Sequence, residues 1–332
     1  MLLVKIIGVA ISALEKLSRV EIGRAWEDPA LEQALGPVRA GDLQTGLELV
    51  KAARGQNELR ALRVWQLADA AIAHVDALAT RAGDDPDALL WLGAARIKHA
   101  WEIRGASYAK YVGSERFQQF WSVLSTAAEP LHRAAHLLPE DPVPWEQLQW
   151  HGIGTQVGRP ELDRIWKELS ARDPRLFAGH YTRAQVLCEK WYGSHEELLA
   201  FARDTVASAD PGDPLTAILA LAHFEVAWRM MDDNDSAFLS KAAIEGYFSR
   251  RETAEELVRA ADQWQTQAQP HPRALEAHHL FGAAFYYSGH HARAQRLLSG
   301  ARNRIPENLP WSVASLTPGR CYARVRRQLG VD

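Results

Sequence analysis

Asp-Pro pairs recur along the chain and constrain its fold more than any other feature. The pairs begin at Asp28, Asp85, Asp141, Asp173, Asp210 and Asp213. An aspartate accepts hydrogen bonds from the free amides at a helix start, and a proline there loses nothing by lacking an amide hydrogen. Each pair therefore predicts the beginning of a helix. Ser194 with Glu197, and Thr253 with Glu256, have the spacing of a capping box and predict two more starts.

The segments between these starts have the apolar spacing of helices. Apolar residues three and four positions apart include Leu62, Trp65, Ala68, Ile72, Val75 and Leu78. No run of alternating β-branched residues and no Asn-Gly or Asp-Gly hairpin signal interrupts them. The sequence therefore predicts an all-α fold with negligible β structure. Long helices are expected over residues 57–82 and 114–138, and an irregular stretch over 305–319 before a basic helix near 320–329.

Composition indicates a packed, water-soluble chain. Of its 332 residues, 47% are hydrophobic and 24% charged, and the formal net charge is -3. These values are ordinary for globular proteins, and the length suits two domains or one elongated repeat array. Because no block of like charge is long enough for a nucleic-acid-binding arm, no nucleic-acid partner is expected.

A repeat pattern is visible in the C-terminal half. Pro142, Pro174 and Pro211 recur at roughly the 34-residue period of a tetratricopeptide unit. The segment 275–306 resembles one complete unit of that family, with weaker copies beginning at Trp145, where Gly152 is the small residue, and at Phe177, where it is Ala184. In the segment 275–306, the residues that match the pattern are Gly282, Phe285, Gly289, Ala294, Leu298, Ala301 and Pro306. This resemblance implies an α-solenoid of stacked antiparallel helix pairs, in which each pair buries its apolar face on the next.

A second resemblance covers residues 190–203, KWYGSHEELLAFAR. The segment is similar to part of a bacterial family of helical-repeat domains of unknown function. That resemblance implies no activity. From the residues alone, Trp191 and Tyr192 end one helix, Gly193 turns the chain, and Ser194 begins the next helix.

Four regions are expected along the chain. They are an amphipathic N-terminal capping helix (1–25), a divergent helical half (26–140), tetratricopeptide-like repeats (141–306), and an irregular segment with a basic C-terminal helix (307–332). The apolar stretch 1–14 lacks a preceding basic run and is too short to span a membrane. We therefore expect a cytoplasmic protein without a membrane span. Weak contact of the first helix with a membrane surface and a secretory role are the alternatives.

Residues able to carry chemistry are present without a recognisable catalytic or metal-binding arrangement. His132 and His136 are spaced for one helix face, but Arg133 stands where the HExxH motif has its glutamate. The pairs 278–279 and 290–291 flank one expected turn and could converge on a metal ion. Cys188 has no sequence signature linking it to a histidine. We expect no catalytic residue, no metal ligand and no cofactor.

The repeat resemblance also implies a binding groove lined by first-helix residues. Carried over residue by residue, it predicts a groove formed by Gln149, Gln156, Tyr181, Gln185, Glu276, His279 and Tyr286. The tryptophans at 65, 91, 101, 121, 145, 150, 166 and 228 are expected mainly in the core. The leading hypothesis is a non-catalytic module that binds a protein or peptide segment.

A homodimer formed through an exposed end of the array is also open. Two other functions stay open. One is a metal-dependent or small-molecule enzyme that uses the histidine-rich C-terminal half. The other is nucleic-acid binding by the basic C-terminal helix, through Arg320, Arg324, Arg326 and Arg327.

Overall fold

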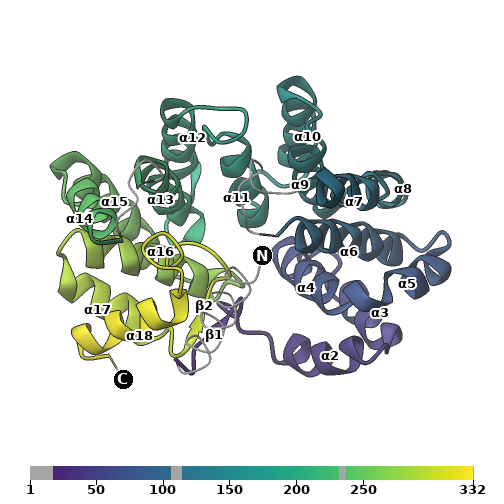
Figure 1. Cartoon of the computed structure of the whole chain (residues 1–332), viewed down its shortest axis with the longest axis horizontal. Helices are drawn as coiled ribbons and strands as arrows, with labels where there is room; N and C mark the ends of the chain where they lie inside the picture. Colours follow the sequence, from purple (N-terminus) through teal and green to yellow (C-terminus); the bar gives the residue numbers. More distant parts are fainter. Residues whose placement is uncertain (1–17, 106–113, 232–236, 332) are drawn as a thin grey trace. The chain divides into compact units, whose positions relative to one another are not determined.

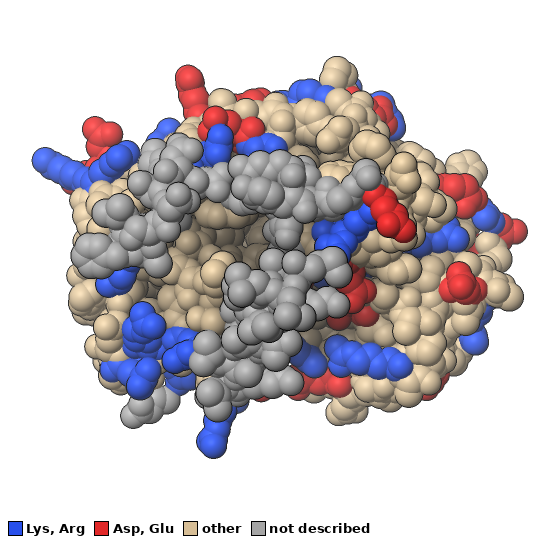
Figure 2. Space-filling model, in the orientation of Figure 1, with Lys and Arg blue, Asp and Glu red and all other residues tan. Residues whose placement is uncertain are grey.

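The computed structural model describes residues 18–105, 114–231 and 237–331. Their regular secondary structure is almost entirely helical (Figure 1). Helix accounts for 71% and strand for 1% of the structure, which confirms the all-α prediction. The chain forms two compact units. Residues 28–186 make the middle unit, and residues 1–27 together with 187–332 make the terminal unit. Acidic and basic side chains are mixed over much of the face drawn in Figure 2.

The middle unit is built around the long helix α6, which packs against α3, α4, α5, α7, α8 and α9. Its elements are α2 (Pro29–Arg39), α3 (Leu43–Lys51), α4 (Asn57–Ala70), η1 (Ile72–His74), α5 (Val75–Ala82), α6 (Pro86–Arg104), α7 (Ser114–Ser125), α8 (Ala128–Leu137), α9 (Val143–Thr155), α10 (Arg159–Arg172) and α11 (Phe177–Val186).

Both long helices expected from the sequence are divided in two, so those two predictions are wrong. A short 3-10 turn, η1, separates α4 from α5, and a turn at residues 126–127 separates α7 from α8. Pro130 lies in the first turn of α8, where its missing amide hydrogen costs nothing, whereas inside one continuous helix it would remove a hydrogen bond. Each division lets the chain fold back on itself, and both α7 and α8 pack on α6.

The terminal unit combines the helices after residue 187 with a short segment from near the chain start. Its helical elements are α12 (His195–Ser208), η3 (Pro214–Ala217), α13 (Ile218–Met231), α14 (Ala237–Phe248), α15 (Arg251–Gln265), α16 (Ala274–Tyr287), α17 (His291–Ser299) and α18 (Pro318–Leu329). Strand β1 (Glu21–Ile22) pairs in parallel with β2 (Arg304–Ile305), with Glu21 opposite Arg304. These two-residue strands are all the sheet in the described residues, as expected.

Most of the predicted helix starts are present. Asp28 and Asp85 cap α2 and α6, the Asp141 carboxylate accepts from the Val143 amide 3.0 Å away, and Ser194 caps α12. Asp213 begins only the short η3, while the pair at 210–211 lies in a turn.

The start predicted at Thr253 is wrong. Helix α15 begins at Arg251, and Thr253 is buried inside it rather than capping it. Glu256 does not complete a capping box there but binds other side chains, as described below.

Helix pairing follows the small residues that the repeat pattern singled out. A Cβ placed on Gly282 of α16 would lie 2.5 Å from the Leu298 side chain of α17, and one on Gly152 of α9 would lie 2.8 Å from Leu162 of α10. A side chain at either position would require the facing leucine to move, so the glycines allow close contact between the paired helices. The stacking of such pairs into a solenoid and the boundaries at 25, 140 and 306 stay predictions.

The expected N-terminal helix falls largely on residues 1–17, which lie outside the described residues. Residues 18–27 form a turn, β1 and extended chain. This part of the predicted 1–25 segment is therefore not helical.

Candidate functional site

The predicted groove residues of the terminal unit all lie on α16 and differ in their surroundings. His279 is fully buried; its Nε2 lies 2.6 Å from the carbonyl of Arg304, and its Nδ1 accepts from the Trp311 indole at 3.1 Å. Glu276 pairs with Arg273 at 3.4 Å, and the half-buried Tyr286 donates to a side-chain oxygen on α18. In this conformation His279 presents no surface to a ligand, because it joins α16 to the irregular segment before α18.

The predicted groove residues of the middle unit lie on α9 and α11. Gln149 is fully buried and donates to the carbonyl of Gly179 at 3.3 Å, so it lies between the two helices. Gln156 is exposed at the left-handed C-cap of α9. Tyr181 is half-buried and Gln185 buried, one turn apart on α11. The structure thus brings Tyr181 and Gln185 onto one helix face and places Gln156 apart from them at the end of α9.

Three half-buried aromatic side chains meet on the middle unit, and we call them the aromatic face. Trp65 of α4 stacks on Trp150 of α9 with ring centroids 5.7 Å apart, and Trp150 lies 6.5 Å from Tyr181 of α11. All three keep part of their surface exposed. Their helices are far apart in sequence, so only the packing of α4, α9 and α11 assembles this face.

Polar groups adjoin the aromatic face and are themselves held by hydrogen bonds. The Lys98 ammonium of α6 lies 3.9 Å from the centre of the Trp65 ring, and this side chain is largely buried. Glu146, one turn before Trp150, is buried and accepts a 3.0 Å hydrogen bond from the Thr182 hydroxyl. A charge over an indole ring and a buried carboxylate beside it fix the orientation of the aromatic side chains.

One acceptor beside this face lacks a partner. The amide nitrogen of Gln147 donates to Glu146 at 2.5 Å, while its buried Oε1 has no hydrogen-bond partner among the described residues. Gln147 and Trp150 are three residues apart and share a face of α9. Gln147 is 0% exposed, so in this conformation the oxygen is closed to a ligand.

A second aromatic cluster lies on α6 and α7. Trp101 contacts Phe120 at 5.2 Å and Phe117 contacts Trp121 at 5.7 Å, while the Trp121 indole donates to the Gly154 carbonyl of α9. Trp121 is 46% exposed. The expectation that the tryptophans are core residues is met at Trp91 and Trp145, which are buried, but not at Trp121.

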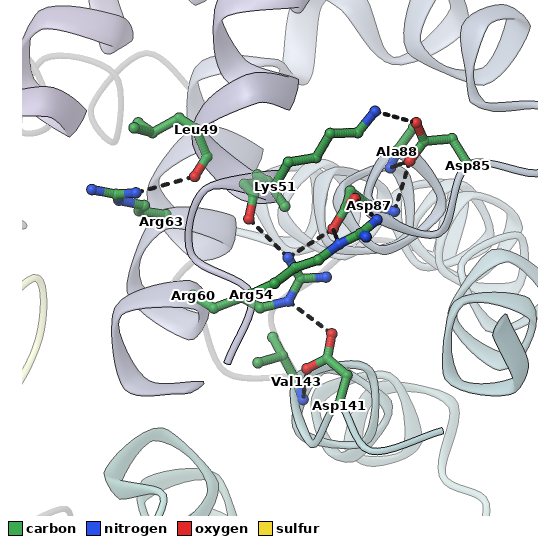
Figure 3. Close-up of polar contacts among 11 residues, drawn as sticks. Leu49, Lys51, Arg54, Arg60, Arg63, Asp85, Asp87, Ala88, Asp141 and Val143 are labelled. Atoms are coloured by element: carbon green, nitrogen blue, oxygen red, sulfur yellow. Dashed lines mark hydrogen bonds and ion pairs between the residues drawn. The ribbon is translucent and has the colours of Figure 1, made fainter. Parts of the chain in front are cut away.

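The most highly charged interior of the middle unit lies where its helices begin (Figure 3). Arg60 of α4 is 1% exposed and binds Asp87 at 2.8 Å and Asp141 at 2.7 Å. Arg54 forms a second contact with Asp87, and Lys51 binds Asp85 at 2.6 Å. Arg60, Asp87 and Asp141 are buried, whereas Arg54 and Lys51 are partly exposed, and each cation of the network has a carboxylate partner.

Helix α4 extends this network to other helix starts. Arg63 binds Asp28 at 2.7 Å, Asn57 donates to Asp173 at 2.9 Å, and the Glu58 carboxylate accepts from the Phe177 amide at 2.8 Å. Burial alone would raise the pKa of Asp28, but hydrogen bonds from Arg63 and from backbone amides outweigh it and lower that pKa. Asp28 and Asp141 therefore accept hydrogen bonds from amides at the starts of α2 and α9 and also bind α4.

A tyrosine, a histidine and a carboxylate lie in a row in the terminal unit. His223 Nδ1 lies 2.7 Å from the Tyr247 hydroxyl and its Nε2 lies 2.9 Å from Glu256, which also binds Arg203 at 2.8 Å. Burial raises the pKa of Tyr247 well above its ordinary value. Burial would also raise the pKa of Glu256, but hydrogen bonds from His223 and Arg203 bring it to about 2. A nearly inaccessible, protonated phenol is a poor nucleophile, so this arrangement is a structural network.

The described residues offer no other recognisable centre for metal or nucleophilic chemistry. No group of three or more His, Cys, Asp or Glu side chains among them is arranged to hold a metal ion. Burial raises the pKa of the Cys188 thiol well above its usual value, which disfavours the reactive thiolate. In the part of the chain that the structure describes, no helix is both long and apolar enough to cross a membrane.

Comparison with known proteins adds no family to these observations. No family model, curated protein or solved structure matches the chain. The residues that sequence reasoning missed are Trp65, Lys98, Glu146 and Trp150. Of these four, Lys98 could have been noticed in the sequence, because it is a charged residue within the Ala- and Leu-rich stretch of α6.

Proposed function

We propose that the protein is a non-catalytic module that binds a protein or peptide segment, and that the aromatic face of the middle unit receives this segment. In this proposal the helix pairs stack as a tetratricopeptide-like solenoid, and α4, α9 and α11 contribute to its inner surface. Tyr181 and Gln185 belong to the proposed surface, as the repeat resemblance implied. Trp65 and Trp150 extend it.

The contact between Trp65, Trp150 and Tyr181 is the observation that carries the proposal. Tryptophan and tyrosine provide large apolar contact area together with a polar atom, and they are frequent anchors of binding surfaces. Here the rings are held by stacking and by Lys98, so little side-chain freedom would be lost on binding.

The exposed parts of the rings suggest what the segment supplies. An apolar or aromatic side chain of the segment would pack on Trp150 and Tyr181. We therefore expect short segments with at least one aromatic or large aliphatic side chain.

A selection from random short peptides displayed on phage would test the proposal. The full-length protein is immobilised, enriched peptides are synthesised, and their Kd is measured by calorimetry. We expect the double variant Trp65→Leu/Tyr181→Ala to weaken binding by at least about tenfold, because two anchor side chains are lost.

Trp166→Leu is the matched control, since Trp166 is another half-buried tryptophan of the middle unit, located on α10 in contact with His180. Circular dichroism and the thermal midpoint establish that each variant folds. The proposal fails if no peptide is enriched over the immobilisation surface alone, or if the enriched peptides bind the double variant and the wild type equally.

A further inference from the structure

The C-terminal part of the chain has a charge distribution that the net charge of -3 conceals. Residues 277–331 contain eight arginines, no lysine and a single acidic residue, Glu307. Helix α18 is the extreme case, because it holds four arginines and no aspartate or glutamate. In Figure 2, Lys and Arg side chains gather at the lower left, where Figure 1 places α18.

Several of these arginines are used within the terminal unit. Arg293 pairs with Asp262 at 2.6 Å, Arg304 donates to the Trp26 carbonyl at 3.1 Å, and Arg326 donates to the carbonyls of Arg302 and Val331. Arg326, which the sequence placed with the three other tail arginines, therefore stabilises the end of its own helix.

The other three arginines of α18 form one exposed stripe, which we call the arginine stripe. Arg320, Arg324 and Arg327 are spaced four and three residues apart and are exposed, and none has an ion pair with any described residue. The opposite face, with Tyr322, Val325 and Leu329, is buried. Mutual repulsion of three unpaired guanidinium groups is relieved when an anion binds them.

We propose that the arginine stripe binds the phosphate backbone of nucleic acid. The stripe covers about 10 Å of helix axis, the length over which one strand of a duplex presents roughly three phosphates. The planar guanidinium fork matches phosphate geometry and is always charged.

Two other classes of partner fit this surface less well. Insertion into a lipid surface needs the apolar face of a helix, and that face of α18 is buried within the unit. A protein interface needs an apolar centre, whereas the large apolar residue exposed near the stripe is the isolated Leu316, at 82% exposure. A phosphate backbone needs neither feature, because binding to it is dominated by charge.

Fluorescence anisotropy with a labelled mixed-sequence DNA duplex and the matching single strand tests this proposal. The full-length protein is titrated at NaCl concentrations from about 50 to 200 mM, a range over which phosphate contacts weaken measurably. We expect binding that does not depend on base sequence, with a Kd of roughly 10⁻⁴ to 10⁻⁶ M. Arg320→Gln/Arg324→Gln/Arg327→Gln should weaken it by at least about tenfold and reduce the slope of log K against log salt by about 2–3.

The control removes equal charge elsewhere. Arg116→Gln/Lys167→Gln/Arg259→Gln alters three other exposed cations that have no ion pair with the described residues, and should change the affinity by less than about threefold if binding is local. The proposal is overturned if wild-type protein does not bind at the lowest salt, or if the two triple variants lose affinity equally. It is also overturned if poly-glutamate competes as well as DNA at equal charge, which would assign the stripe to acidic polypeptides.

Discussion

The two units differ in how one buried junction in each of them is held. In the middle unit, charged side chains of α4 bind the aspartates at the starts of other helices, and Arg60 alone binds two of them. The terminal unit also contains a charged network around Glu256, but its junction between α16 and the segment before α18 is neutral: His279 joins α16 to the Trp311 indole and the Arg304 carbonyl. A buried ion pair is costly to break on one side only, because the remaining charge is left without a partner. Loss of a neutral hydrogen bond costs less.

The largest effect is expected from Arg60→Met. Removing this side chain leaves Asp141 without its guanidinium partner and Asp87 with Arg54 alone, so the free energy of unfolding should fall by about 3–5 kcal/mol. Urea unfolding followed by circular dichroism measures the loss, and hydrogen exchange should locate it in residues 28–186.

Arg133→Met is the control, because Arg133 forms exposed ion pairs with Asp84 and Glu129. Its removal should leave the urea midpoint unchanged. Equal effects of the two substitutions would show that burial does not distinguish these ion pairs, and the contrast between the units would then lose its basis.

A smaller effect is expected from His279→Phe in the terminal unit. The phenyl ring fills similar space but leaves the Trp311 indole and the Arg304 carbonyl without their partner, at a cost of roughly 2–4 kcal/mol. Hydrogen exchange should increase in residues 304–331 and not in the middle unit. Uniform acceleration over both units would contradict the local role assigned to His279.

Two glycine-to-alanine substitutions in the terminal unit should change the stability of the fold in opposite directions. Gly282→Ala brings a methyl group within 2.5 Å of Leu298 and should destabilise by about 1–3 kcal/mol, less the gain in helix propensity. Gly246→Ala lies in α14 with no atom within 4 Å of the added Cβ, and should stabilise by up to about 1 kcal/mol. Thermal midpoints that shift in the same direction would show that Gly282 is not a packing contact.

Mild acid should lower the stability of both units. Burial lowers the pKa of His279 to about 3 and that of His151 to about 4, against about 6.5 in an unfolded chain. At a pH between the folded and unfolded pKa values, each histidine binds a proton in the unfolded chain and not in the folded chain. The free energy of unfolding therefore falls as the pH drops below about 6.5. Urea midpoints measured from pH 7.5 to 5 should decline.

The two histidines can be separated by substitution. His151→Gln should flatten the decline in the middle unit only, as seen by hydrogen exchange, while His279→Phe flattens it in the terminal unit. Asp28 and Asp85 add a loss only at still lower pH: their pKa values are lowered in the folded chain, so their contribution begins to be lost as the pH falls through the unfolded value of about 3.9. An acid response that is unchanged in both variants would mean that other groups dominate.

The predicted site was only partly recoverable from the sequence, for a reason visible at individual residues. Tyr181 was singled out by its place in the repeat pattern, and the structure puts it beside the Trp150 ring, which in turn stacks on Trp65. His279 occupied an equivalent position but is enclosed by Trp311, which lies in an irregular segment that the repeat pattern does not cover. Trp65 and Trp150 looked like core residues because spacing reports which residues share a helix face, not what covers that face.

The sequence by itself determined several helix starts and the positions where paired helices pack closely. Asp-Pro pairs, Ser194 and the small residues at 152 and 282 act through the backbone or through neighbouring helices, so their effects can be derived from residues close in the chain. The tertiary structure alone decided which aspartates meet α4, which aromatic rings meet on one face, and which arginines of α18 stay exposed. These outcomes depend on contacts between residues far apart in sequence, whose burial and charge pairing no local pattern encodes.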